Sequence, residues 1–211
     1  MTLQELATSL HDCQRCKLSR LGRSQVVFGT GNPHATIMFV GEAPGFHEDR
    51  LGEPFVGAAG KLLNDLLRSA GLSRDDVYIA NVIKCRPPNN RDPEPDEVET
   101  CKPFLIQQIQ MISPKLVCTL GNWATQTLLG RKVGITKIRG QAIPLSEFVM
   151  FPMLHPAAGL HQGGLLEPLR EDFRKLKTYL EKAGTPKPAP VPVPGTAPEQ
   201  SPADQMDLFG S

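Results

Sequence analysis

The chain has 211 residues, of which 40% are hydrophobic, and a formal net charge of +1 at pH 7. This length and apolar content suit one folded domain, and we expect a monomer because no surplus apolar segment indicates an interface. No stretch approaches the roughly 18 apolar residues of a membrane span, and the first residues do not resemble a signal peptide, so we expect a cytoplasmic protein. The small net charge neither requires nor excludes a nucleic-acid partner.

The apolar pattern predicts helices and strands that alternate along the chain. Helices are expected at 3–11, around 62–70, and at 96–111, 122–129 and 166–181, and strands at 36–40, 77–83, 116–120 and 148–151. This alternation favours an α/β fold with a mostly parallel sheet that helices cover on both faces. Ligands of such sheets bind at the carboxyl ends of the strands, where residues 41–45, residues 81–86 and His155 are expected to converge.

The composition changes at residue 184. Residues 1–183 are expected to form the folded domain, and the proline-rich residues 184–204 to form a disordered linker. There is almost no apolar periodicity until Met206, Leu208 and Phe209 in the final segment, 205–211. The sequence therefore predicts one domain, a linker and a short terminal tail.

Four cysteines form a plausible ligand set for a metal centre. Cys13 and Cys16 form a CxxC pair, and Cys85 and Cys101 flank a loop and the start of a helix, so two remote segments supply four thiolates. Cys118 lies inside an apolar strand and is expected to be a small buried hydrophobe. The spacing alone fits zinc, a [4Fe-4S] cluster or four unrelated reduced thiols.

Two short motifs follow predicted strands. The first is Gly41-Glu42-Ala43-Pro44-Gly45, whose glycines allow the backbone to approach a ligand, although a tight surface turn has the same composition. The second begins at His155, which alone is also typical of an ordinary loop histidine. Combined with the segments 52–57 and 78–88, these motifs supply a carboxylate, an aromatic ring, an amide and an imidazole, which together suit binding and cleavage of a pyrimidine nucleoside.

Taken together, the cysteine pattern and these ordered segments resemble the family 4 uracil-DNA glycosylases of bacteria, over residues from about 10 to 180. The resemblance implies a three-layer α/β/α uracil-DNA glycosylase fold that binds uracil flipped out of DNA. It also implies a [4Fe-4S] cluster of mainly structural role, held by Cys13, Cys16, Cys85 and Cys101.

The resemblance assigns a role to each of four side chains. Phe55 would stack on the uracil ring, and the amide of Asn81 would pair with its O4 and N3–H edge. Glu42 would activate water or stabilise the sugar cation, while His155 would donate a hydrogen bond to O2 as the leaving base becomes anionic. No lysine is placed to form a Schiff base, so we expect a monofunctional hydrolase that leaves an abasic site.

Further positions bear on the base and on the DNA backbone. The backbone at Gly41 and Ala43 would hold the base, and Ala43 stands where thermophilic members of the family tend to have glycine, so its methyl group would narrow the pocket slightly. Arg86 and Pro87 resemble the loop that clamps the DNA backbone, and Leu160 is a candidate wedge into the vacated stack or an ordinary loop anchor. Residues 86–100 lack the Arg-Arg-Ile-His insertion of the related crosslinking family, which disfavours covalent capture of the sugar.

The end of the chain resembles a protein-binding motif. Gln205-Met206-Asp207-Leu208-Phe209 is similar to the pentapeptide that binds the bacterial β sliding clamp, with Gln205, Leu208 and Phe209 as the anchoring side chains. The expected partners are therefore uracil-containing DNA and the clamp. Two other functions remain open at this point: a glycosylase for another deaminated base, and a non-catalytic, clamp-recruited DNA-binding adaptor.

Overall fold

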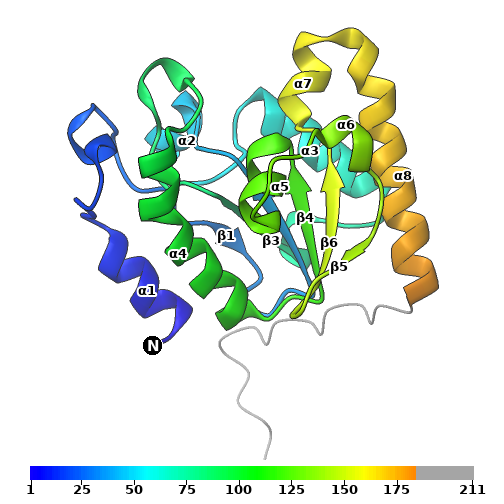
Figure 1. Cartoon of the computed structure of the whole chain (residues 1–211), viewed down its shortest axis with the longest axis horizontal. Coiled ribbons are helices and arrows are strands. Elements are labelled where there is room, and N and C mark those ends of the chain that lie inside the picture. The colour runs from blue at the N-terminus through cyan, green and yellow to red at the C-terminus, as the bar shows by residue number, and fades with distance from the viewer. Residues whose placement is uncertain (184–211) are drawn as a thin grey trace, which may run out of the picture.

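A computed structural model describes residues 1–183, and these form an α/β/α sandwich around one six-stranded sheet (Figure 1). The predicted linker and clamp-binding tail lie outside the described residues. The sheet has the order β1-β3-β2-β4-β6-β5. Its centre consists of four parallel strands, namely β2 (Ile37–Gly41), β3 (Val77–Asn81), β4 (Leu116–Leu120) and β6 (Val149–Met153). The predicted fold class is confirmed.

Two short antiparallel strands close the edges of the sheet. β1 (Thr30–Gly31) pairs with β3, and β5 (Ile143–Pro144) pairs with β6. The sequence did not predict either strand, because two residues are too few to show an alternating pattern. The expected strand 77–83 ends at Asn81, but its backbone continues beside β2, where the amides of Val82 and Ile83 donate to the carbonyls of Gly41 and Glu42.

Helices cover both faces because successive strand residues point to opposite sides. Phe39, Ile79 and Cys118 pack on one face against α3 (Ala58–Ser69) and α8 (Leu166–Ala183). Met38 and Val117 pack on the other face against α4 (Pro95–Ile112) and α5 (Asn122–Leu129), and α1 (Leu3–Leu10) contacts α4. Each predicted helix is therefore present, with bounds shifted by a few residues.

The remaining elements are short and were not predicted. They are α2 (Phe46–Leu51), α6 (Ile135–Ile138), α7 (Pro156–His161) and the 3-10 turns η1 (Lys17–Arg20), η2 (Arg74–Asp76), η3 (Pro88–Asn90) and η4 (Gly163–Leu165). Among residues 1–183, no helix has both the length and the apolar character required to cross a bilayer. α2 and α7 follow the ends of β2 and β6, so they stand at the carboxyl edge of the sheet.

Candidate active site

A cavity of about 540 Å³ opens at the carboxyl edge of the sheet. The parallel register places Gly41 of β2 directly beside Asn81 of β3, so that the motifs at the two strand ends meet. Six side chains predicted from the sequence line this cavity, namely Glu42, Ala43, Phe55, Asn81, Pro87 and His155. The expected convergence of remote segments is thus present in the structure.

Gly41 forms a point of close approach between two of these side chains. A Cβ atom at Gly41 would lie 2.4 Å from Oδ1 of Asn81 and 2.6 Å from Cζ of Phe55. No side chain fits at this position unless its neighbours move. The absence of a Cβ therefore lets an amide and an aromatic ring approach the end of β2 together.

Asn81 presents a hydrogen-bonding group that the protein itself does not satisfy. The residue is only 2% exposed, and within residues 1–183 its Oδ1 is buried without a hydrogen-bond partner. Its main chain is fixed, because Nζ of the buried Lys84 donates to the Asn81 carbonyl at 2.8 Å and also to Gln108. A buried unpaired amide is costly unless a ligand completes its hydrogen bonds, so Asn81 is suited to recognise a polar ligand edge.

Phe55 is held in an unusual backbone conformation. Its φ of 55° lies in the left-handed region, which is uncommon for residues other than glycine. Glu48 supports the following residues, because its Oε1 accepts from the amides of Val56 and Gly57, each at 2.9 Å. The ring of Phe55 lies 5.6 Å from that of His155 between centroids, at an angle of 32°. These two rings therefore shape one wall of the cavity.

His155 is a neutral hydrogen-bond donor. It caps the N-terminus of α7, where its Nδ1 accepts from the amide of Ala157 at 3.1 Å, so the ring proton is on Nε2. Burial lowers the pKa of His155 to about 4, although the nearby Glu48 carboxylate opposes this shift. Gly121 packs behind it, since a Cβ there would lie 3.1 Å from the Cβ of His155. The imidazole thus remains uncharged at neutral pH.

Glu42 has an environment that favours its protonated form. Burial raises the pKa of Glu42 to about 7, and the negative charge of Asp92 contributes further to the increase. The carboxyl group is half-buried at the cavity wall, directly after β2. A carboxylate with a pKa near neutrality is well matched to proton transfer.

The three residues predicted to contact DNA lie in different surroundings. Pro87 lines the cavity, whereas Arg86 lies outside the lining and donates from Nε to Oδ1 of Asn90 at 2.7 Å. Leu160 is on α7 and is 47% exposed, so it is free to contact a partner.

The four predicted cysteine ligands gather around a second, small cavity between the N-terminal segment and α4. Cys13 and Cys16 are half-buried, while Cys85 and Cys101 are buried. Burial raises the pKa of Cys101 to about 11, and the thiols of Cys85 and Cys16 contribute to this increase. Cys118 lies apart, fully buried in β4, as the sequence predicted.

Hydrogen-bond donors point at the sulfur atoms. Arg23 donates to Sγ of Cys85 at 2.8 Å and to the carbonyl oxygen of Cys13, and the amide of Lys84 donates to Sγ of Cys101 at 3.3 Å. Such donors stabilise thiolates and tune the clusters that they bind. In the described part of the chain, no three His, Cys, Asp or Glu side chains are arranged to hold a single metal ion.

The sequence analysis did not identify several residues that the structure places around the main cavity. Six such residues line the cavity, namely Phe46, His47, Glu48, Asn90, Arg91 and His161. The only sequence feature that could have identified Glu48 as a site residue is its position, four residues before the segment 52–57. Arg74 contacts the backbone at Phe55 from 19 residues away, and no local pattern indicates that contact.

Comparison with known proteins gives consistent similarities. The model of the uracil DNA glycosylase superfamily matches residues 28–181, which include every residue that lines the main cavity. A type-4 uracil-DNA glycosylase of Sulfurisphaera tokodaii is 47% identical, over 88% of this chain and 87% of that protein. The type-4 enzymes of Saccharolobus solfataricus and Archaeoglobus fulgidus are 46% and 42% identical, over 84% and 83% of this chain and 86% and 92% of theirs.

Proposed function

Because the chain belongs to the type-4 uracil-DNA glycosylases of the uracil-DNA glycosylase superfamily, it is an N-glycosyl hydrolase that releases uracil from DNA, and we propose which residues perform the reaction. The observation that carries this assignment is the meeting of Asn81, Phe55 and His155 around the cavity at the end of β2. An unpaired amide, an aromatic face and a neutral donor together match the edge, the face and the O2 atom of uracil.

Recognition of the base follows from Asn81 and Phe55. The unpaired Oδ1 of Asn81 accepts the N3–H of uracil, and its Nδ2 donates to O4. Cytosine presents an unprotonated N3 and an amino group in these positions, so it would leave the buried amide unsatisfied. Phe55 stacks on the ring, and the close approach at Gly41 limits the width of the pocket.

The chemistry needs opposite charges to be stabilised on the two sides of the breaking bond. As the C1′–N1 bond breaks, its electron pair goes to uracil, and Nε2–H of His155 donates to O2, where negative charge develops. Water forms the new bond to C1′ and gives a proton to the carboxylate of Glu42, while the released uracil anion takes a proton from solvent. The products are free uracil and an abasic site.

A uracil-release assay on single-stranded and U:G duplex oligonucleotides tests this assignment. His155→Ala and Glu42→Gln are expected to lose about 100-fold or more in kcat/KM. His34→Ala, which changes an exposed histidine remote from the cavity, is the matched control and should act like the unaltered enzyme. Release of hypoxanthine or xanthine with no uracil release would show a different substrate, and DNA binding without any base release would show an adaptor.

The four cysteines around the second cavity support a [4Fe-4S] cluster as the resident cofactor. When bound, the cluster would supply a structural crosslink between the N-terminal segment and α4. Anaerobically purified protein should contain iron and acid-labile sulfide, and Cys101→Ala should lose both, whereas Cys118→Ala should retain them. Zinc in place of iron in such a preparation would overturn this part of the proposal.

The residues proposed to contact the DNA backbone and the base stack follow from the sequence motifs and from the solvent exposure of Leu160. Arg86 and Pro87 are assigned to the DNA backbone, and the exposed Leu160 to the gap that the flipped nucleotide leaves. Leu160→Ala should weaken uracil release from duplex DNA more than from single strands, because only the duplex leaves a stacked gap to fill. Equal losses on both substrates would contradict the wedge.

Attachment to the β sliding clamp rests on the sequence alone, since Gln205, Leu208 and Phe209 lie outside the described residues. We also propose, on the same ground, that the enzyme acts in the cytoplasm as a monomer. Fluorescence polarisation of the labelled segment 200–211 with purified clamp tests the first point. Replacement of Leu208 and Phe209 by alanine should abolish binding and leave uracil release from a short oligonucleotide unchanged.

A further inference from the structure

The rim of the main cavity carries an exposed aromatic ring with two arginines beside it. Phe46 is the first residue of α2, lines the cavity and is 46% exposed. The guanidinium groups of Arg86 and Arg50 lie over this ring, with their carbons 5.1 and 5.6 Å from its centroid. The ring of His47 meets the same ring edge-on, with 5.5 Å between the centroids.

The charges of both arginines are available to a partner. In the part of the chain that the structure describes, neither Arg50 nor Arg86 forms an ion pair, whereas Arg91 nearby is bound to Glu97 and Glu94. Arg86 uses only its Nε, in the bond to Asn90, which leaves its terminal N–H groups free of that contact. Unpaired guanidinium groups beside a DNA-binding cavity are suited to phosphate oxygens.

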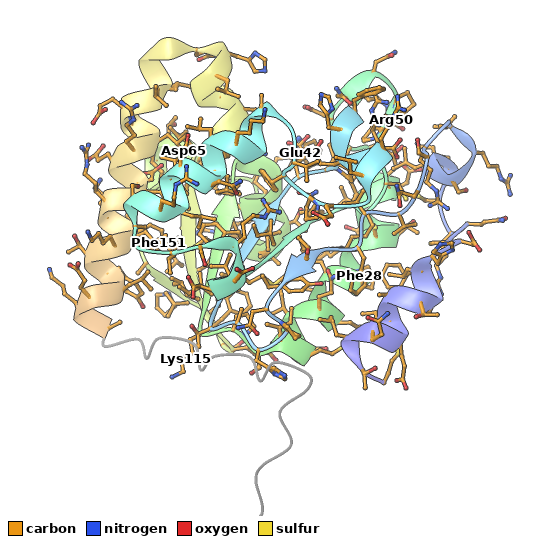
Figure 2. The ribbon with its side chains drawn as sticks, turned by 180° about the vertical axis from the view of Figure 1, so that it is seen from behind. Phe28, Glu42, Arg50, Asp65, Lys115 and Phe151 are labelled. Carbon is orange, nitrogen blue, oxygen red and sulfur yellow. The ribbon has the colours of Figure 1, made fainter. Side chains whose placement is uncertain are left out.

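The position of this cluster relative to the reaction site indicates its ligand. Figure 2 shows Arg50 and Glu42 in the same upper part of the molecule, and Glu42 lines the cavity together with Phe46. A nucleotide next to a uracil in the cavity must lie near its rim, and α2 forms part of that rim because Phe46 and His47 line the cavity. An exposed aromatic ring under two cationic groups matches that nucleotide, because the arginines can turn from the ring to its phosphates and leave the ring to stack on its base.

We propose that Phe46, Arg50 and Arg86 form a subsite for the nucleotide next to the uracil, with its base stacked on Phe46 and its phosphates bound by the two arginines. This inference rests on the proposed function and deepens it, since it concerns the same DNA strand. A base stacked on the rim has left the duplex, so the subsite favours single-stranded uracil over uracil in a duplex.

The decisive test pairs removal of the side chain with removal of the base. Single-stranded oligonucleotides carry one uracil, and the nucleotide on its 5′ or its 3′ side is replaced in turn by an abasic tetrahydrofuran residue. The unaltered enzyme should lose about tenfold in kcat/KM on one of the two, which is typical of one base–aromatic stack. Phe46→Ala should have a kcat/KM about tenfold lower on the intact strand, and the abasic residue should reduce it no further. The reason is that the variant and the abasic residue each remove one partner of the same stacking interaction.

Two further variants separate stacking from a general disturbance of α2. Phe46→Trp should keep the response to the abasic residue, since indole also stacks. Leu51→Ala is the matched control, because Leu51 is another exposed apolar residue of α2, at 66%, and does not line the cavity. It should behave like the unaltered enzyme on both strands.

The arginines and the strand preference give independent measurements. Arg50→Gln and Arg86→Gln should each reduce the slope of log affinity against log salt by about one phosphate contact. Phe46→Ala should also narrow the ratio of single-strand to duplex activity. If Phe46→Ala and the unaltered enzyme lose equally on the abasic strand, the stacking subsite is wrong. If the unaltered enzyme releases no uracil from any strand, the proposed function itself fails.

Discussion

The guanidinium group of Arg74 holds the backbone of Phe55 in place, donating to its carbonyl oxygen at 3.0 Å and to that of Pro54 at 2.7 Å. The left-handed conformation of Phe55 needs such support, since a residue with a Cβ is disfavoured there by about 1–2 kcal/mol. Gly60 allows the backbone of Phe55 to pack closely, because a Cβ at Gly60 would lie 1.8 Å from the carbonyl oxygen of Phe55. The ring of Phe55 thus depends on contacts outside the cavity.

Replacement of Arg74 tests this dependence. Arg74→Gln removes two charge-assisted hydrogen bonds to carbonyl groups, so we expect KM to increase about tenfold and the stability to fall by about 2–3 kcal/mol. Arg68→Gln is the control, because Arg68 is exposed and, within residues 1–183, forms an ion pair with Asp65 of the same helix and with no other residue. A normal KM in Arg74→Gln would show that Phe55 keeps its conformation without this support.

The pKa of Glu42 predicts the pH dependence of the reaction. Its carboxylate form is the active one, so kcat/KM should increase with pH up to about 7 and remain level above it. His155, with a pKa of about 4, should not limit the rate over this range, because it stays neutral throughout. The residual activity of Glu42→Gln should be independent of pH between about 5 and 8, which is roughly 1.5 units either side of an ordinary histidine pKa.

Glu42 is also expected to lower the stability of the folded protein at the pH values at which it is catalytically active. The pKa of Glu42 is higher in the folded than in the unfolded state, so the folded protein binds more protons between pH 4.5 and about 7 and loses stability as the pH rises through this window. Glutamine does not ionise, and Glu42→Gln should therefore be more stable than the unaltered protein at pH 8, by on the order of 1–2 kcal/mol after screening by water. Thermal melts at pH 5 and pH 8 measure this, and an equal difference at both pH values would contradict it.

Gly41 provides a steric test of the cavity. Gly41→Ala places a methyl group in the space that Asn81 and Phe55 occupy, so at least one of them must move. We expect uracil release to fall by about 100-fold or more, because misplaced recognition groups lose their interactions with the base. Gly163→Ala, where an added Cβ meets nothing within 4 Å, should retain full activity.

The sequence alone predicted the α/β/α fold and the long elements. Regular periodicity over many residues, as in α3 and α4, reflects local geometry and needs no knowledge of distant contacts. The same reasoning missed α2 and β5, which are too short to show a pattern. The roles of Glu42, Asn81 and His155 were predicted from motifs and stay predictions until variants are measured, although the structure places all three around one cavity.

What the sequence determined by itself is therefore which residues stand at the strand ends, since that order follows from local pattern and from motif. The tertiary structure decided which of them are buried, charged and in contact. The pKa values of Glu42 and His155 depend on the exclusion of water by neighbouring segments, and the support of Phe55 by Arg74 joins groups 19 residues apart. Burial and long-range contact are properties of the packed chain, so no local pattern encodes them.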